Sequence, residues 1–265
     1  MDITPDKQNL NEVFSNITYY IDFYQRQYKW TKEPVKILLT DIFYRFNTEY
    51  KNHKANEIKL DKLIEQYAWY YLGTFVTNQS DGKLFVVDGQ QRLTTLTLIL
   101  IKLKNLSKEM ESELSDWVSP KIVGQSGYEK RFWMYHEEHT KTMKQLYEGI
   151  EASKVDTSSG LTAENMLENY NIIDKWLNEQ INKDKHKLES FIFYFLKRLV
   201  LINLEVNQTD VPMIFEVIND RGIELKPHEI LKGKLLGQIK KDELAELHLN
   251  ELWDDSIQAI NFKSI

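Results

Sequence analysis

The residues best able to do chemistry lie together in one nonapeptide, DGQQRLTTL, at residues 88–96. A run of four hydrophobic residues precedes it and leucines at helical spacing follow it, so it is expected to join a strand to an amphipathic helix. The first turn of such a helix leaves backbone N–H groups unpaired at the positive end of the helix dipole, which favours a bound phosphate. Gly89 would let a ligand approach the backbone, and Arg92 adds a fixed fork of donors.

Asp88 is the only acid in this turn. Beside a phosphate its carboxylate would repel the ligand, unless it holds Mg²⁺, orients a water or fixes Arg92. Gln90 and Gln91 add amide donors and acceptors without charge. A structural explanation is equally compatible with the pattern, in which Asp88 caps the helix and Arg92 pairs with a surface acid.

Two further segments have the composition of a ligand site. YQRQYKW, at residues 24–30, combines three aromatic rings with two cations and two amides, which can stack on a base and bind a phosphate. A strand end with extended basic side chains is its alternative. FEVINDRGIELKPHEILK, at residues 215–232, contains an NDRG turn whose glycine is expected in the left-handed conformation. A plain connection between two helices is the alternative there.

In this order, the segments IDFYQRQYKW, YYLGTFVTNQSDGKLFVVDGQQRLTTLTLIL and FEVINDRGIELKPHEILK resemble the N-terminal domain of GmrSD-type, modification-dependent (type IV) restriction proteins. Related phage-defence proteins such as SspE share this domain. The resemblance spans about residues 9–253. The chain departs from the family pattern at Asp22, where proline is usual, and at Glu229, where aspartate is usual. Lys226 also stands where a serine or threonine helix cap would be expected.

The resemblance implies an α/β (α+β) fold with a ParB/sulfiredoxin-like nucleotide-binding core, in which DGQQR binds and hydrolyses a nucleoside triphosphate (NTP) with Mg²⁺. Hydrolysis would regulate or power a nuclease, usually an HNH domain in the same chain or in a partner subunit, that acts on phage DNA with modified bases or backbone. The implied catalytic residues are Asp88, Gln91 and Arg92, with Asp88 also the expected Mg²⁺ ligand. The implied nucleotide-binding residues are Gly89, Gln90, Arg26, Gln25, Asn219, Arg221, Gly222 and Lys232. The implied base-stacking or modification-sensing residues are Tyr24, Tyr28 and Trp30.

Composition sets limits on these functions. With 265 residues, 42% of them hydrophobic, the chain can bury a full core. Its 34 basic and 40 acidic residues give a net charge of −6, which argues against nonspecific DNA binding by the whole surface but allows a local basic cleft. The lack of cysteine excludes disulfides, zinc–thiolate sites and a cysteine nucleophile. Without a signal peptide or a long apolar span, a cytoplasmic location away from membranes is expected.

An HNH nuclease needs a histidine base and a metal site. His136 and His139 are three residues apart in YHEEH, but the charged pattern around them predicts a solvated helix face. We therefore expect no nuclease centre in this chain. Its end at Ile265, shortly after Trp253, suggests a truncated protein or a split gene.

Hydrophobic periodicity and turn residues predict the elements of the fold. Strands are expected at residues 17–23, 71–77, 83–87 and 199–206, the middle two joined as a hairpin by an Asp-Gly turn. Helices are expected at residues 9–14, 32–46, 91–110, 130–149, 163–180, 188–196, 211–218, 227–239 and 242–259. Residues 50–62 should form an exposed loop and residues 155–160 a linker. We thus expect a core of residues 1–110 and 199–237, a helical insertion at 111–198, and a C-terminal helix at 238–265 that leads to a nuclease domain outside the chain.

Three functions remain open at this point. The first is a nucleotide-binding, NTP-hydrolysing regulatory domain of a restriction or phage-defence system, in which Arg26 or Arg221 neutralises charge on the phosphoryl oxygens. The second is a noncatalytic module that binds DNA or senses its modification through aromatic residues. The third is a ParB-fold nuclease, which is disfavoured because the motifs lack clustered carboxylates or histidines for two metals. The expected partners are an NTP, phage DNA and an HNH nuclease, and a homo-oligomer is an open alternative.

Overall fold

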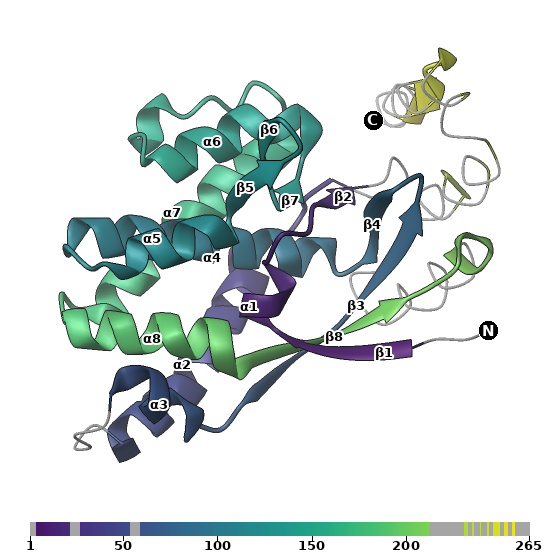
Figure 1. Ribbon diagram of the computed structural model, residues 1–265. Helices are drawn as coiled ribbons and strands as arrows, with labels where there is room; N and C mark the ends of the chain where they lie inside the picture. The colour runs from purple at the N-terminus through teal and green to yellow at the C-terminus, as the bar shows by residue number, and fades with distance from the viewer. Residues whose placement is uncertain are drawn as a thin grey trace.

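The computed structural model describes residues 4–21, 27–53 and 59–211, and isolated positions at 231–232, 235, 239, 243, 246–249, 252–253 and 256–257 (Figure 1). Over these residues the chain is a mixed α/β fold, which confirms the predicted class. The described strands form a six-stranded mixed sheet and a separate two-stranded hairpin. The likeness to a ParB/sulfiredoxin-like core stays a prediction.

The six-stranded sheet is assembled from distant parts of the chain, in the order β1-β8-β3-β4-β2-β7. Its strands are β1 Thr4–Asn9, β2 Tyr19–Ile21, β3 Tyr70–Ser80, β4 Lys83–Asp88, β7 Met134–Tyr135 and β8 Leu199–Glu205. The separate hairpin consists of β5 Val123–Ser126 and β6 Glu129–Phe132. Strand β8 enters between β1 and β3, antiparallel to β1 and parallel to β3. Strands that precede α4 in the sequence and strands that follow it therefore contribute to the same sheet.

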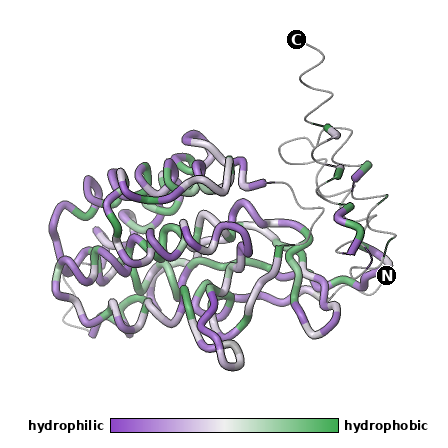
Figure 2. The backbone as a smooth tube through the Cα atoms, turned by 90° about the horizontal axis from the view of Figure 1, so that it is seen from above, coloured by the Kyte–Doolittle hydropathy of each residue, from purple (hydrophilic) through white to green (hydrophobic). Residues whose placement is uncertain are grey.

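Helix α4 lies at the centre of the helical layer, with α5, α6, α7 and α8 around it (Figure 1). The helices are α1 Leu10–Val13, α2 Lys32–His53, α3 Leu60–Glu65, α4 Gln90–Glu109, α5 Leu114–Val118, α6 Thr140–Glu148, α7 Leu161–Ile181 and α8 Lys185–Arg198. Short 3-10 turns occur at η1 Ser119–Lys121, η2 Glu137–His139, η3 Ala152–Lys154 and η4 Gln208–Asp210. Seen from above, hydrophobic stretches run through the interior of this body and hydrophilic ones lie toward its outside (Figure 2).

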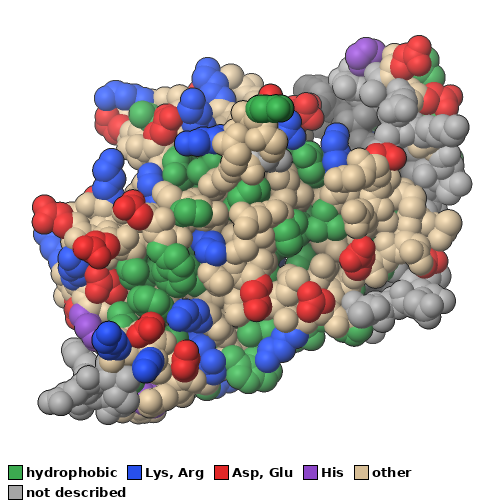
Figure 3. All heavy atoms as spheres, in the orientation of Figure 1, with side chains coloured by type: hydrophobic (Ala, Val, Ile, Leu, Met, Phe, Trp, Pro, Cys, Tyr) green, Lys and Arg blue, Asp and Glu red, His purple; other side chains and the backbone are tan. Residues whose placement is uncertain are grey.

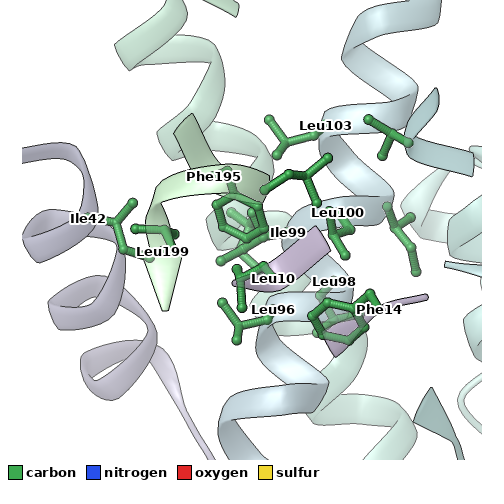
Figure 4. Packing of buried hydrophobic residues seen from close by; sticks show 14 of the residues in the cluster. Leu10, Phe14, Ile42, Leu96, Leu98, Ile99, Leu100, Leu103, Phe195 and Leu199 are labelled. Atoms are coloured by element: carbon green, nitrogen blue, oxygen red, sulfur yellow. The ribbon is translucent and has the colours of Figure 1, made fainter. Parts of the chain in front are cut away.

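The core around α4 explains why the start of this helix is held firmly. The leucines that predicted one apolar face are all buried, and so are most of the residues on the other sides of the helix. Figure 4 shows side chains of α4 meeting Leu10 and Phe14 at α1 and Phe195 of α8. The hydroxyls of Thr95 and Thr97 inside α4 donate to the carbonyl one turn earlier, which gives these buried donors a partner within the helix. The first turn of α4 thus projects from a rigid, fully packed helix.

On the face seen in Figure 3, the charged side chains of the described residues form no single patch of one sign. On the face seen in Figure 3, lysine and arginine side chains are interspersed with aspartate and glutamate side chains, mainly over the helical half. Such mixing keeps the local potential low. The net charge of −6 is therefore not gathered into one strong field on this face.

Most predicted elements are confirmed. The hairpin of β3 and β4, strand β8 and the helices α4, α7 and α8 occur within a few residues of their predicted bounds. Helix α1 is shorter than predicted, and Asn9 caps it in a reciprocal capping box with Glu12. The strand predicted at residues 17–23 is present as β2, and residues 22–23 lie outside the described residues. The helices predicted after residue 211 also lie outside them, apart from isolated helical positions.

The exposed loop predicted at residues 50–62 is wrong at both ends. Helix α2 continues to His53 and α3 begins at Leu60, while residues 54–58 lie outside the described residues. Tertiary packing extends α2, because Phe46 and Tyr50 pack on each other and Phe46 also contacts Phe191 of α8. The lysine-rich composition gave no sign of these contacts.

The helix predicted at residues 130–149 is wrong over its first half. Strands β6 and β7 occupy residues 129–135, and only α6 is helical as expected. Trp133 packs against Gly124 so closely that a Cβ on the glycine would lie 2.1 Å from the indole ring, and the hairpin depends on this contact. Strand β7 pairs with β2 through Met134 and Tyr19. The stretch predicted as a helical insertion therefore supplies an edge strand to the core sheet.

The prediction that His136 belongs to a solvated helix face is also wrong. His136 directly follows β7, is 6% exposed, and its Nε2 lies 2.9 Å from the hydroxyl of Thr94 on α4. Burial, with a smaller contribution from His139, lowers the pKa of His136 to about 3. His136 is therefore a neutral side chain that joins the sheet edge to the central helix.

Candidate functional site

The turn before α4 has the geometry that its sequence predicts. Strand β4 ends at Asp88 and α4 begins at Gln90, so Gly89 alone connects them. Gly89 has φ +95, in the left-handed region, and a Cβ there would lie 2.7 Å from Cβ of Phe75. The N-cap residue is Gly89, which has no side chain to cap the helix. A helix N-terminus at the end of a buried strand favours an anion, because its first backbone N–H groups have no partners within the helix.

Arg92 extends from the first turn of α4 to the edge of β3 beyond its pairing with β4, where no other described strand pairs. The pairing of β3 with β4 ends at Val76 and Asp88. Earlier on the same strand, the carbonyl of Thr74 accepts a hydrogen bond from Nη1 of Arg92 at 2.8 Å. A Cβ on Gly73, which has φ +117, would lie 3.0 Å from the same nitrogen. The guanidinium therefore occupies the place where a continued β4 would pair, and a glycine makes room for it.

The surroundings of this guanidinium act on its pKa in opposite directions. Burial lowers the pKa of Arg92, whereas the nearby Asp88 carboxylate and Tyr71 raise it. Arginine stays protonated under such shifts. Arg92 is thus a partly desolvated cation with Asp88 close by, and the guanidinium has donors beyond the one used by Thr74.

Gln90 has a buried polar side chain whose hydrogen bonds are not all satisfied by the described residues. Its side chain is 4% exposed, and its Oε1 has no hydrogen-bond partner among the described residues. A buried acceptor without a partner costs about 1–3 kcal/mol. Such a cost marks a position where a donor from a ligand or a water belongs.

The side chain of Gln91 links two parts of the chain, and the catalytic role that the resemblance implies for it stays a prediction. Its Oε1 accepts hydrogen bonds from the backbone N–H groups of Lys29 at 2.7 Å and Trp30 at 3.0 Å. Its Nε2 donates to the carbonyl of Gln27 at 3.0 Å. The amide of Gln91 therefore holds the end of the aromatic and basic segment against the start of α4.

Helix α7 holds the same segment from the other side. The hydroxyl of Thr162 accepts from the N–H of Tyr28, and Asn165 donates to the Tyr28 carbonyl. Asn169 donates to the carbonyl of Trp30 and to the hydroxyl of Tyr28. Residues 27–30 belong to no helix or strand, so these side chains replace the backbone partners that regular structure would supply.

These α7 residues were missed by the sequence reasoning. Thr162, Asn165 and Asn169 are all buried, at spacings of three and four residues. Polar residues repeated on the inward stripe of a helix are a signal that could have found them, since buried polar groups need partners. Thr74 had no such signal, because it contributes its backbone carbonyl.

Tyr28 is a correction to the predicted base-stacking residues. Its ring is fully buried, and its hydroxyl also lies 2.8 Å from that of Thr95. A ring enclosed in this way offers no face to a base. Trp30 is partly exposed and packed on the core beside the turn, so its proposed role stays a prediction.

The roles of the remaining predicted residues stay predictions. Lys232 is described and 8% exposed. The residues that lie outside the described residues are Tyr24, Gln25, Arg26, Asn219, Arg221 and Gly222. Their predicted roles are untested.

Asp88 is the carboxylate that the DGQQR turn itself offers to a magnesium ion. Among the described residues no group of three or more histidine, aspartate or glutamate side chains could hold a metal. Mg²⁺ commonly binds through one or two carboxylates together with water and substrate phosphates, so Asp88 beside an anion site fits this ion. No described helix has the length and apolar character needed to cross a bilayer.

The structure is thus an α/β domain in which a glycine turn, a helix N-terminus and a partly buried arginine lie together, a combination that favours an anion. The chain matches the family described as the GmrSD restriction endonuclease, N-terminal domain, over residues 10–236. It therefore belongs to this family, whose members are components of restriction and phage-defence systems. A search of curated proteins finds no match to the chain.

Proposed function

We propose that this domain binds an NTP at the DGQQR turn and hydrolyses it with Mg²⁺. Hydrolysis then regulates an HNH nuclease elsewhere in a restriction system that acts on modified phage DNA. The observation that carries the proposal is that the start of α4, at the left-handed Gly89, and the guanidinium of Arg92 lie at one turn. The same proposal locates the domain in the cytoplasm, where incoming DNA and the nucleotide pool are found.

Each residue of the turn has a distinct part in the proposed reaction. Arg92 and the backbone N–H groups at the start of α4 bind phosphoryl oxygens and stabilise the charge that develops on them. Asp88 holds Mg²⁺ or orients the attacking water, and Mg²⁺ neutralises phosphate charge when bound. Gln91 acts as a positioning residue, because its amide is used by the backbone of residues 27–30.

A noncatalytic DNA-binding or modification-sensing module is the second candidate. The partly exposed ring of Trp30 beside the turn favours it, because an exposed aromatic ring next to a cation can stack on a base. A ParB-fold nuclease ranks below both. The described residues place the single carboxylate of Asp88 at the turn, whereas two-metal hydrolysis needs several.

The test is phosphate release from ATP, GTP, CTP and UTP with Mg²⁺, with and without DNA. Wild-type protein is compared with Arg92→Ala and Asp88→Ala. Arg131→Ala and Asp116→Ala are matched controls at positions outside the turn, and circular dichroism checks that all five proteins fold. Hydrolysis that is lost in the first two variants and kept in the controls supports the proposal. Hydrolysis unchanged in Arg92→Ala contradicts it, and nucleotide-independent, salt-sensitive DNA binding without any nucleotide binding favours the second candidate.

A further inference from the structure

Two exposed aromatic rings lie at the start of β3, a few residues before the part of this strand that contacts Gly89 of the turn. Trp69 is 55% exposed and directly precedes β3, and Tyr71, in β3, is 44% exposed. Residues two apart in an extended chain project to the same side. We call Trp69 and Tyr71 the aromatic platform.

A cation borders the platform on the β1 side. Nζ of Lys7 lies 5.2 Å from the centroid of the Trp69 ring. Lys7 pairs with Ile202, and Tyr71 pairs with Val200. Because Val200 and Ile202 are two residues apart on β8, Lys7 and Tyr71 lie on the same face of the sheet. The platform is therefore flanked by a positive charge on its own face.

A second cation borders the platform on the side of the turn. Gly73 follows Tyr71 across an irregularity in the pairing of β3 with β8, and a Cβ on Gly73 would lie 3.0 Å from Nη1 of Arg92. Tyr71 also acts electrostatically on Arg92 and raises its pKa. The edge of β3 to which Arg92 donates through Thr74 thus joins the platform to the proposed phosphate site.

We propose that the aromatic platform stacks a nucleobase whose phosphate lies at Arg92 and the DGQQR turn. A flat, anionic ligand fits two exposed rings between two cations, because base stacking on aromatic rings and charge pairing act on neighbouring parts of one nucleotide. The base belongs either to the NTP or to a single strand of DNA, and stacking accepts any base. The inference rests on the proposed function, and it moves the base-stacking role from the buried Tyr28 to Trp69 and Tyr71.

The test uses three probes that differ in base and backbone: ATP with Mg²⁺, inorganic tripolyphosphate, and an oligothymidylate single strand. Binding is measured by calorimetry for wild-type protein, Trp69→Ala, Tyr71→Ala and Tyr71→Phe. Tyr44→Ala is the matched control, since Tyr44 is 69% exposed on α2. Truncating exposed rings leaves the core intact, so all variants are expected to fold.

The alanine variants should weaken binding of a base-containing probe by about tenfold, the usual order for loss of one stacked base. Tyr71→Phe and Tyr44→Ala should bind like wild type, and tripolyphosphate should bind all variants equally. If the alanine variants lose affinity for ATP, the stacked base belongs to the nucleotide. If they lose affinity for the oligonucleotide, the stacked base belongs to DNA. Unchanged affinity for both base-containing probes overturns the inference. Failure of wild type to bind ATP and tripolyphosphate refutes the proposed function instead, while the oligonucleotide still tests the platform.

Discussion

Replacing Gln91 with leucine should destabilise the protein far more than its position at a helix start suggests. The variant keeps the size of the side chain but removes three hydrogen bonds to the backbone of residues 27–30. A net contribution of about 1 kcal/mol for each bond gives a loss of roughly 3 kcal/mol in the free energy of unfolding. For a domain of this size that loss corresponds to a fall in Tm of about 6–12 °C.

Urea denaturation followed by circular dichroism measures this loss, and Gln66→Leu is the matched control. Gln66 is exposed at the end of α3, and its substitution is expected to change stability by less than about 0.5 kcal/mol. Gln91→Leu should also weaken ATP binding more than its stability loss alone explains, because residues 27–30 lose their attachment to α4. Equal unfolding free energies for the two variants would refute the reasoning, since the three bonds would then contribute nothing net.

Three further predictions concern the backbone, a buried histidine and a buried tyrosine. Gly89→Ala should cost about 2–5 kcal/mol in urea unfolding, because left-handed strain adds to the clash with Phe75. Gly82→Ala, with φ +71 and no atom within 4 Å, should cost only the strain of about 1–2 kcal/mol, and equal costs would refute the role of the contact. Because the folded pKa of His136 is lowered to about 3 and the unfolded imidazole titrates near 6.5, stability is complete above pH 6.5 and falls toward pH 3. His136→Gln should reduce this fall by about 1.4 kcal/mol for each pH unit below 6.5. The free energy of unfolding is measured for both proteins at pH 7.5 and pH 5, and an equal decrease in the two proteins would contradict the prediction. Tyr28→Phe should lose about 1–2 kcal/mol through its hydroxyl and leave nucleotide affinity unchanged; a drop in affinity measured by calorimetry would restore Tyr28 as a ligand contact.

The candidate site was predictable from the sequence where it depends on residues that are adjacent in the chain. Gly89 in the left-handed conformation, the strand before it and the helix after it follow from local preferences that act over a few residues. The family resemblance also came from the residue order alone, and the match over residues 10–236 confirms it. Local sequence is sufficient here because a strand, a glycine turn and a helix each depend on near neighbours.

The roles of individual side chains were not predictable in the same way. Gln91 and Tyr28 look like ligand contacts in the sequence, yet one holds backbone and the other is buried. His136 looks solvated, yet it packs on α4. Burial and hydrogen-bond partners depend on residues far away in the chain, so no local pattern reports them.

The sequence by itself determined the class of fold, the connection of strand to helix through Gly89, and the family of the chain. Only the tertiary structure decided that Arg92 reaches the edge of β3 beyond its pairing with β4, that α7 holds residues 27–30, and that Trp69 and Tyr71 are exposed beside this edge. The physical reason is that strand order and helix packing bring together segments separated by long stretches of chain. Contacts across such separations have no periodicity or turn signal in the sequence.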